Sequence, residues 1–325
     1  MRTVRTVAEL RSALAPARRD GLTIGLVPTM GALHDGHLSL IARAHEQCDV
    51  VVVSLFVNPA QFNERADLER YPRDERRDAE LAAATGADVL FAPSVEEVYP
   101  AGFATSVEVL GVTERLEGAT RGSEHFRGVA TVVTKLLCMA MPDVAYFGQK
   151  DAQQVVVIRR LARDLNLPVR IEALPTVREA DGLALSSRNA LLSADQRARA
   201  LALPAALAAA SALAASGERA TQALLDAARA AMHPFGVEPE YVALVEPDTL
   251  EPVATLDGET LLALAARIGE VRLIDNEILL PAGALRDAGA QGHAGAQGHA
   301  GAQESAATHN PSQPLEGEAI ATCSA

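Results

Sequence analysis

Two histidines three residues apart, His34 and His37, stand where an apolar run gives way to an amphipathic one. The run over residues 24–27 predicts a buried strand, and the pattern over residues 38–47 predicts a helix. Backbone N–H groups at a helix start are unpaired and lie at the positive end of its dipole, so this place suits phosphate. Gly36 lacks a Cβ, which lets a ligand approach the backbone. The arrangement predicts a nucleotide triphosphate held for attack at phosphorus.

Two other interpretations of the histidine pair are open. The spacing can be a surface coincidence, or it can be half of a zinc site. Zinc needs further ligands at a recognisable spacing. The sequence has no His-Glu-x-x-His motif, and its three cysteines, Cys48, Cys138 and Cys323, are isolated from one another. The segment by itself favours phosphate handling over coincidence, and coincidence over metal binding.

Lysine is rare in this chain and therefore informative. Of the 29 basic residues only Lys135 and Lys150 are lysines, and the others are arginines. A lysine supplies a compact charge that arginine does not. Lys150 follows an apolar strand in a Gly-Gln-Lys-Asp turn, which favours a functional role, whereas Lys135 lies in a helical pattern.

Alternating elements must position these residues. Strands are predicted over residues 23–27, 50–57, 89–92, 144–147 and 169–174, and helices over residues 38–47, 73–85, 129–139 and 152–165. Such alternation predicts an α/β fold with a Rossmann-like, doubly wound parallel sheet. Ligands bind these sheets beyond the carboxyl ends of the strands, where the histidines and Lys150 fall.

The chain changes character near residue 176. A long Ala/Leu-rich helical region, with a break at residues 216–217, precedes short strands predicted over residues 241–245, 261–267 and 271–274. We interpret residues 176–281 as a smaller C-terminal α+β domain with an antiparallel sheet, after a first domain of residues 1–175. Residues 282–325 lose apolar periodicity and contain Ala-Gly-Ala-Gln-Gly-His twice, at 288–293 and 294–299, which predicts a disordered tail.

The composition of the chain limits which classes of partner and which compartment we expect for the protein. The 325 residues suffice for two domains with cores of their own. A formal net charge of −13 argues against a general nucleic-acid surface, because phosphate backbones require concentrated positive charge. We identify no signal peptide and expect no stretch that spans a membrane. The isolated cysteines fit a reducing compartment, so we expect a cytoplasmic protein. From the charge and the absence of a predicted span, we expect no nucleic-acid or membrane partner.

Residues 28–37, Pro-Thr-Met-Gly-Ala-Leu-His-Asp-Gly-His, resemble the signature of the pantothenate synthetases (pantoate–β-alanine ligases), a family of HxGH nucleotidyltransferases. Further motifs match in order: Phe-Val-Asn-Pro-Ala-Gln-Phe at 56–62, Tyr-Pro-Arg at 71–73, Phe-Ala-Pro-Ser at 91–94, Phe-Arg-Gly-Val at 126–129, Phe-Gly-Gln-Lys-Asp-Ala-Gln-Gln at 147–154 and Asp-Gly-Leu-Ala-Leu-Ser-Ser-Arg-Asn at 181–189. The likeness extends over residues 1–280 and excludes the tail.

The resemblance implies an ATP-dependent ligase in pantothenate biosynthesis. The pantoate carboxylate attacks the α-phosphorus of ATP to give pantoyl adenylate and pyrophosphate, and the β-alanine amine then displaces AMP. The implied catalytic residues are His34, His37 and Lys150, with His37 also placed to protonate the pyrophosphate. Such chemistry depends on positioning and electrostatics. The resemblance also implies Mg²⁺, a homodimer and a smaller C-terminal domain that is lid-like over the nucleotide.

Family position further implies the binding residues. Gln61 and Gln154 are assigned to pantoate. The residues assigned to the nucleotide are Met30, Gly31, Ala32, Leu33, His34, Asp35, Gly36, His37, Gly148, Gln149, Lys150, Asp151, Val177, Leu185, Ser186, Ser187 and Arg188. Asp78 is a possible magnesium ligand, but the metal ligands stay open, because Arg76 and Arg77 replace acidic residues of the family pattern. Leu185 replaces the usual methionine.

Three rival functions share parts of this pattern. Another HxGH nucleotidyltransferase, making a dinucleotide or a CDP-linked product, would share the histidines without needing both Gln61 and Gln154. A non-catalytic nucleotide sensor would keep only the fold. A zinc hydrolase would need ligands beyond His34 and His37.

Overall fold

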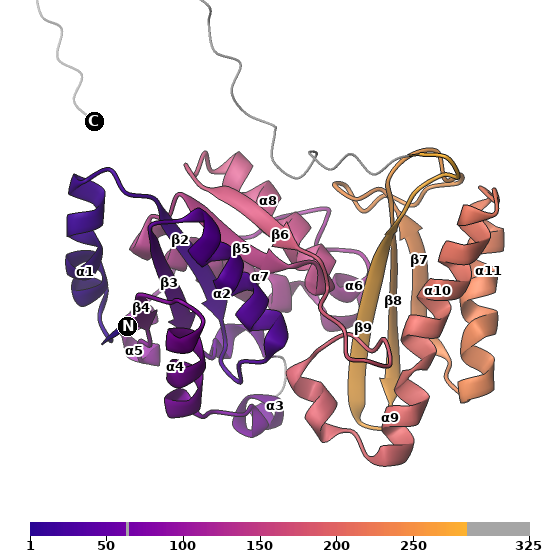
Figure 1. Cartoon of the computed structure of the whole chain (residues 1–325), viewed down its shortest axis with the longest axis horizontal. Helices are drawn as coiled ribbons and strands as arrows, with labels where there is room; N and C mark the ends of the chain where they lie inside the picture. Colours follow the sequence, from indigo (N-terminus) through magenta and orange to yellow (C-terminus); the bar gives the residue numbers. More distant parts are fainter. Residues whose placement is uncertain (63–64, 285–325) are drawn as a thin grey trace, which may run out of the picture. The chain divides into compact units, whose positions relative to one another are not determined.

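The computed structural model describes residues 1–62 and 65–284, which belong to one compact unit, Met1–Gly292. Its larger sheet has six strands in the order β1-β4-β3-β2-β5-β6, and every pairing is parallel (Figure 1). The strands are β1 (Arg2–Val4), β2 (Ile24–Thr29), β3 (Val50–Leu55), β4 (Val89–Phe91), β5 (Val144–Gly148) and β6 (Arg170–Leu174). The predicted Rossmann-like α/β fold is confirmed.

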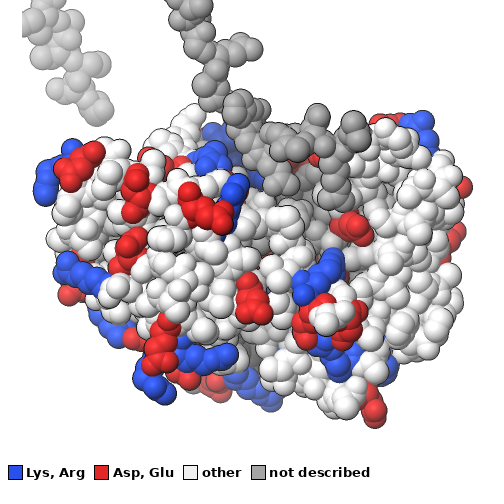
Figure 2. Space-filling model, in the orientation of Figure 1, with Lys and Arg blue, Asp and Glu red and all other residues white. Residues whose placement is uncertain are grey.

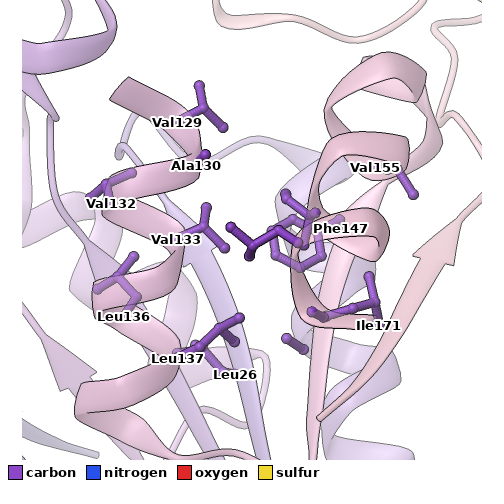
Figure 3. Packing of buried hydrophobic residues seen from close by; sticks show 14 of the residues in the cluster. Leu26, Val129, Ala130, Val132, Val133, Leu136, Leu137, Phe147, Val155 and Ile171 are labelled. Atoms are coloured by element: carbon purple, nitrogen blue, oxygen red, sulfur yellow. The ribbon is translucent and has the colours of Figure 1, made fainter. Parts of the chain in front are cut away.

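Helices cover both faces of this sheet. One face packs against α2 (Asp35–Gln47) and α4 (Glu75–Ala84), and the other against α1 (Val7–Arg19), α7 (Ser123–Ala140) and α8 (Ala152–Asp164). Successive strand residues alternate between the two cores, as Leu26 and Val27 do, because side chains of a strand point to opposite faces. Figure 3 shows the α7 side of this packing, with Val133 and Leu137 directed toward Phe147 of β5. Burial on both faces explains why the strands are continuous apolar runs.

Several element boundaries differ from the sequence prediction. Helix α2 begins at Asp35, not residue 38, because His34 acts as its N-cap. Helix α7 begins at Ser123, six residues before the predicted start. Strand β1 and helix α1 are absent from the sequence prediction. A three-residue edge strand carries too little periodicity to be recognised, whereas α1 has a capping box at Thr6 and buries Leu10 and Leu14, which is a readable helical signal.

The strand order creates a switch point between β2 and β5. These two strands are neighbours, with Gly25 opposite Val144 and Leu26 opposite Ala145. The chain after β2 continues toward β3 on one side, and the chain after β5 continues toward β6 on the other. A crevice outside the strand ends forms at such a point, and it is where ligands of open α/β sheets bind.

The C-terminal part is an antiparallel sheet covered by helices. Its strands are β7 (Pro239–Val245), β8 (Thr260–Ile268) and β9 (Val271–Leu279), in that order. Helices α10 (Ala202–Ala215) and α11 (Thr221–Met232) cover one face (Figure 1), whereas Leu261 and Ala263 of β8 join the core of the larger sheet. The break between these helices agrees with the predicted break at residues 216–217.

The remaining short elements connect these layers. They are η1 (Pro59–Gln61), α3 (Arg65–Arg70), α5 (Val95–Val98), α6 (Glu117–Arg121), η2 (Gln149–Asp151), η3 (Ser187–Leu191), α9 (Ala194–Ala200) and η4 (His233–Phe235). The predicted boundary at residues 175–176 falls just after β6, and the division into domains stays a prediction. The predicted tail lies, from residue 285 onward, outside the described residues.

The expectation that no stretch is long and apolar enough to span a membrane is wrong, as judged by length and composition alone. The 22-residue stretch Ala194–Ala215 is long and apolar enough to cross a membrane, although we expected no such stretch. Core helices pass the same test, and here Leu201 divides the stretch into α9 and α10. The buried residues of α10, among them Leu203, Ala206 and Leu207, pack in the C-terminal core.

Charge is mixed over the visible surface. On the face drawn in Figure 2, acidic and basic side chains lie interspersed. Exposed pairs such as Arg43–Glu46 and Arg76–Glu80 show the same mixing of charge along single helices. That face therefore does not offer the concentrated positive charge that a nucleic-acid backbone requires.

Candidate active site

The turn after β2 is held in an unusual backbone conformation. Gly31 has φ +90°, and Ala32 has φ +51°, a left-handed value that is uncommon for a residue with a Cβ. The buried carboxylate of Asp78 on α4 accepts the backbone N–H groups of Ala32 (2.9 Å) and Leu33 (2.8 Å). Asp78 therefore fixes the turn that leads into the histidine pair.

The two imidazoles lie against each other at the start of α2, with ring centroids 4.1 Å apart. The Nδ1 atom of His34 accepts the N–H of Gly36 at 3.2 Å, and Nδ1 of His37 faces the N–H of His34 at 3.4 Å. A neutral imidazole whose Nδ1 accepts carries its proton on Nε2. We assign this tautomer to both rings from these contacts, which makes each Nε2–H a donor.

Both histidines are neutral at physiological pH. Burial lowers the pKa of His34, and the charge of Lys150 lowers it further. Burial, followed by the charge of His34, lowers the pKa of His37 to about 3. The ligand-free site therefore presents hydrogen-bond donors rather than imidazolium acids.

The loop after β5 brings a positive charge to the same end of the sheet. Lys150 lies in η2, and its Nζ is 3.6 Å from the carboxylate of Asp151. Its side chain is 19% exposed, and its charge is felt by both imidazoles. The structure thus brings Lys150, more than 110 residues further along the chain, to the same switch point between β2 and β5 as His34 and His37.

A third loop, over residues 177–188, completes the cluster. It folds back on itself, because Leu185 N–H donates to the Val177 carbonyl at 3.0 Å and Arg178 pairs with Ala184 in an antiparallel bridge. Ser186 caps η3 by accepting the N–H of Arg188.

Two electrostatic contacts connect the third loop with the others. Desolvation raises the pKa of Asp151, but the charges of Lys150, Arg188 and Arg121 outweigh it and lower that pKa overall. Ser187 hydrogen-bonds Tyr71, whose pKa is raised by burial. Arg188 and Ser187 therefore lie near residues of the other predicted loops.

The two glutamines assigned to pantoate occupy different elements. Gln61 ends η1, its Oε1 accepts from Asn58 Nδ2 at 3.1 Å, and its Nε2 lies 2.7 Å from Met30 Sδ in the turn after β2. Gln154 is half-buried in the first turn of α8, directly after the Lys150 loop. Gln61 therefore contacts the turn after β2. Gln154 lies at the start of α8, directly after the loop that carries Lys150.

Sequence reasoning missed the residues that fix Gln61. The buried side chain of Asn58 donates to the Gly128 carbonyl and accepts from the Tyr99 hydroxyl. Gly128 is required for this approach, since a Cβ there would lie 2.1 Å from the Ala60 carbonyl oxygen. The Phe-Arg-Gly-Val motif at 126–129 was the available signal, because a glycine inside a helix costs stability unless something approaches closely.

His125 gives a testable pH dependence. Its Nδ1–H donates to the Gln61 carbonyl at 2.8 Å, and burial lowers its pKa to about 4. The unfolded chain, with a histidine pKa near ~6.5, binds this proton first, so stability is complete above that pH and falls as pH drops toward 4. When the pH is lowered from 6 to 5, we expect the free energy of unfolding of His125→Asn, which keeps the hydrogen-bond donor, to fall by about 1 kcal/mol less than that of the parent protein. Denaturant unfolding at both pH values measures these free energies. An equal fall in the two proteins would contradict the low pKa assigned to His125.

Asp78 has a structural role at the turn after β2, and its assignment as a magnesium ligand stays a prediction. Both carboxylate oxygens accept backbone N–H groups of the turn. Among the side chains that the structure describes, no three His, Cys, Asp or Glu residues are grouped so as to hold a metal ion. Arg76 pairs with Glu80 on the solvent side of α4, so the departure from the family pattern lies away from the turn. The zinc alternative for the histidine pair therefore lacks its further ligands in the described chain.

Comparison with known proteins agrees with this arrangement. The family model described as pantoate-beta-alanine ligase matches residues 2–278. A pantothenate synthetase of Moorella thermoacetica is 54% identical over 283 residues, covering 86% of this chain and 99% of that protein. A pantothenate synthetase of Cereibacter sphaeroides is 57% identical over 274 residues, covering 84% and 98%.

Solved structures agree as well. Pantothenate synthetase from Thermus thermophilus superposes with a TM-score of 0.82 at 48% identity, covering 86% of this chain and all of that one. Pantoate-beta-alanine ligase from Francisella tularensis, complexed with beta-gamma ATP and beta-alanine, gives a TM-score of 0.72 at 35% identity, covering 86% and 97%. By family model, sequence and structure, the chain belongs to the pantoate-beta-alanine ligase family and is a ligase.

Proposed function

We propose that the turn after β2, the loop after β5 and the 177–188 hairpin together form the site at which this ligase condenses pantoate with β-alanine and consumes ATP. The observation that carries the proposal is the meeting of two neutral Nε2–H donors, from His34 and His37, with the charge of Lys150 at the sheet's switch point. Phosphoryl chemistry requires this combination of fixed donors and positive charge.

In the first step, a pantoate carboxylate oxygen attacks the α-phosphorus, and the bond from that phosphorus to the pyrophosphate oxygen breaks. Negative charge builds on the phosphate oxygens as this happens. His34 and His37 donate hydrogen bonds to them, and Lys150 adds a fixed positive charge. Burial lowers the pKa of His37 to about 3 in the free protein, so it enters the site as a neutral hydrogen-bond donor, and its predicted role as proton donor to the pyrophosphate requires the phosphate charges to raise that pKa.

In the second step, the β-alanine amine attacks the acyl carbon of pantoyl adenylate, and AMP departs with the electron pair of the broken bond. Gln61 and Gln154 hold pantoate, since amides can donate to its carboxylate and exchange hydrogen bonds with its hydroxyls. Ser186, Ser187 and Arg188 bind the β- and γ-phosphates.

The other nucleotide contacts complete this assignment. Asp151 accepts from the ribose hydroxyls, Gly148 allows close approach, and the Val177 backbone faces the adenine. In the turn, residues 30–36 line the nucleotide, with the backbone of Ala32 and Leu33 fixed by Asp78.

One assay tests this function against its nearest rival. With pantoate present and β-alanine absent, the protein should exchange labelled pyrophosphate into ATP, and adding β-alanine should release AMP. Exchange that depends on a nucleoside monophosphate instead would support another HxGH nucleotidyltransferase. Nucleotide binding without exchange in either mixture would identify a sensor.

Magnesium enters this proposal as part of the substrate, the Mg²⁺ complex of ATP. Mg²⁺ commonly needs few protein ligands when phosphates are present. We expect a chelator to abolish adenylate formation and to leave the Tm of the ligand-free protein unchanged within about 1 °C, because a protein-held metal would stabilise the fold. A drop in Tm on chelation, relative to the same buffer without chelator, would reveal a metal site in the protein.

We propose further that the enzyme is a cytoplasmic homodimer. Support comes from the family resemblance and from the free thiols of Cys48 and Cys138, which suit a reducing compartment. Light scattering of the purified protein and fractionation of cells test the two statements separately.

A further inference from the structure

We infer that Asp275 and Asn276, neighbours on strand β9, hold the two loops that carry Lys150 and Arg188, and so act as positioning residues for adenylation. This inference rests on the proposed function, which gives those two cations their roles. Strand β9 is an outer strand of the C-terminal sheet (Figure 1). It lies against η2 and η3, which contain Lys150 and Arg188.

Asn276 holds the lysine loop through its backbone. Its Nδ2 donates to the carbonyl oxygens of Gln149 at 3.0 Å and Lys150 at 2.8 Å. Both amide hydrogens are used, and the residue is only 5% exposed. Its Oδ1 is buried without a hydrogen-bond partner within the described residues. Because an unpaired buried acceptor costs free energy, the two donor contacts are what orient this amide.

Asp275 holds the hairpin through an arginine. Its carboxylate, almost fully buried, accepts from both terminal nitrogens of Arg178 at 2.7 and 3.0 Å. The same guanidinium donates to the Gly182 carbonyl at 3.0 Å, across the hairpin that ends at Arg188. A bidentate pair of this kind fixes orientation as well as distance.

The two contacts are parts of one rigid unit. The Asn276 N–H donates to the Asp275 carboxylate at 2.8 Å, and both residues lie in the continuous pairing of β8 with β9. The separation of the lysine and arginine loops is therefore set by consecutive residues of a single strand. Since a misplacement of about 1 Å can cost ~10²-fold in rate, this separation matters for a transition state that spans both loops.

Double-mutant cycles test whether each residue acts through its own loop. Single-turnover adenylate formation is measured for Asn276→Ala and Asp275→Asn, alone and combined with Lys150→Ala or Arg188→Ala. We expect each positioning variant alone to slow adenylation about tenfold or more. When Lys150 is already alanine, adding Asn276→Ala should lower the adenylation rate by less than about threefold. When Arg188 is alanine instead, adding Asn276→Ala should lower the rate by as much as it does in the parent protein. Asp275→Asn should show the reverse pattern.

A matched control separates positioning from general stability. Leu279→Ala removes a buried side chain that belongs to the C-terminal core, three residues beyond Asn276 on the same strand, so we expect it to lower Tm. We expect its adenylation rate to stay within about twofold of the parent rate at a temperature where it is folded. If Asn276→Ala does not fold, Asn276→Ser, which keeps one donor, replaces it in the cycles.

The outcomes are distinct. Additive losses in all four cycles, or a loss in Leu279→Ala as large as that in Asn276→Ala, would overturn the positioning role. Parental adenylation rates in Lys150→Ala and Arg188→Ala would instead overturn the proposed function of those cations. The inference is supported if the losses are non-additive for Asn276 with Lys150 and for Asp275 with Arg188, and additive for the two crossed pairs.

Discussion

Replacing His37 with alanine is expected to slow pantoyl-adenylate formation by about 10²-fold or more, the scale for losing one preorganised donor to a charged transition state. The donor is the Nε2–H that remains once Nδ1 faces the His34 N–H. His37 is half-buried, and burial holds its imidazole in the neutral form that carries this donor. Rapid-quench measurement of a single turnover with ATP and pantoate isolates this step from product release.

Two further variants define what His37 contributes. His37→Gln keeps an N–H near the Nε2 position and should recover part of the rate, whereas a required imidazolium acid would not be restored by an amide. His45→Ala, at the exposed far end of the same helix, should keep the parental rate. Near-normal single-turnover adenylation in His37→Ala would remove His37 from the mechanism.

Removing the carboxylate of Asp78 is expected to have the largest effect on stability. Asp78→Ala leaves the N–H groups of Ala32 and Leu33 buried without their acceptor, and hydrogen bonds to a charged group contribute about 1.5–3 kcal/mol each. We expect the free energy of unfolding to fall by about 3–5 kcal/mol and adenylation to slow by about tenfold, because the turn leads directly into His34. Denaturant unfolding and the single-turnover assay measure both quantities.

The same helix provides the control for Asp78. Asp74 caps the start of α4 by accepting the Arg77 N–H, and Asp74→Ala should cost only about 1 kcal/mol with no change in adenylation. If Asp78→Asn instead kept its stability and raised the Mg²⁺ concentration needed for activity, Asp78 would be a metal ligand and the backbone contacts would be incidental.

Much of the fold was predictable from local pattern. The apolar runs at residues 50–57 and 144–147 became β3 and β5 with small shifts, because strands buried on both faces need continuous apolar sequence. The family resemblance was likewise readable, because its motifs are short and fall in a fixed order. The short strand Arg2–Val4 escaped, since it is defined by its pairing with β4 rather than by its own periodicity.

The pattern of neighbouring residues is enough to predict the parallel sheet, the family and the strand-to-helix position of His34 and His37. The packed structure was needed to show that both imidazoles are neutral Nε2–H donors, since their pKa values depend on burial. It also decided that Asp78 holds backbone 45 and 46 residues away, and that Asn276 reaches Lys150 across 126 residues. Hydrogen bonds over such separations leave no periodic trace in sequence, because they exist only once the sheets have packed.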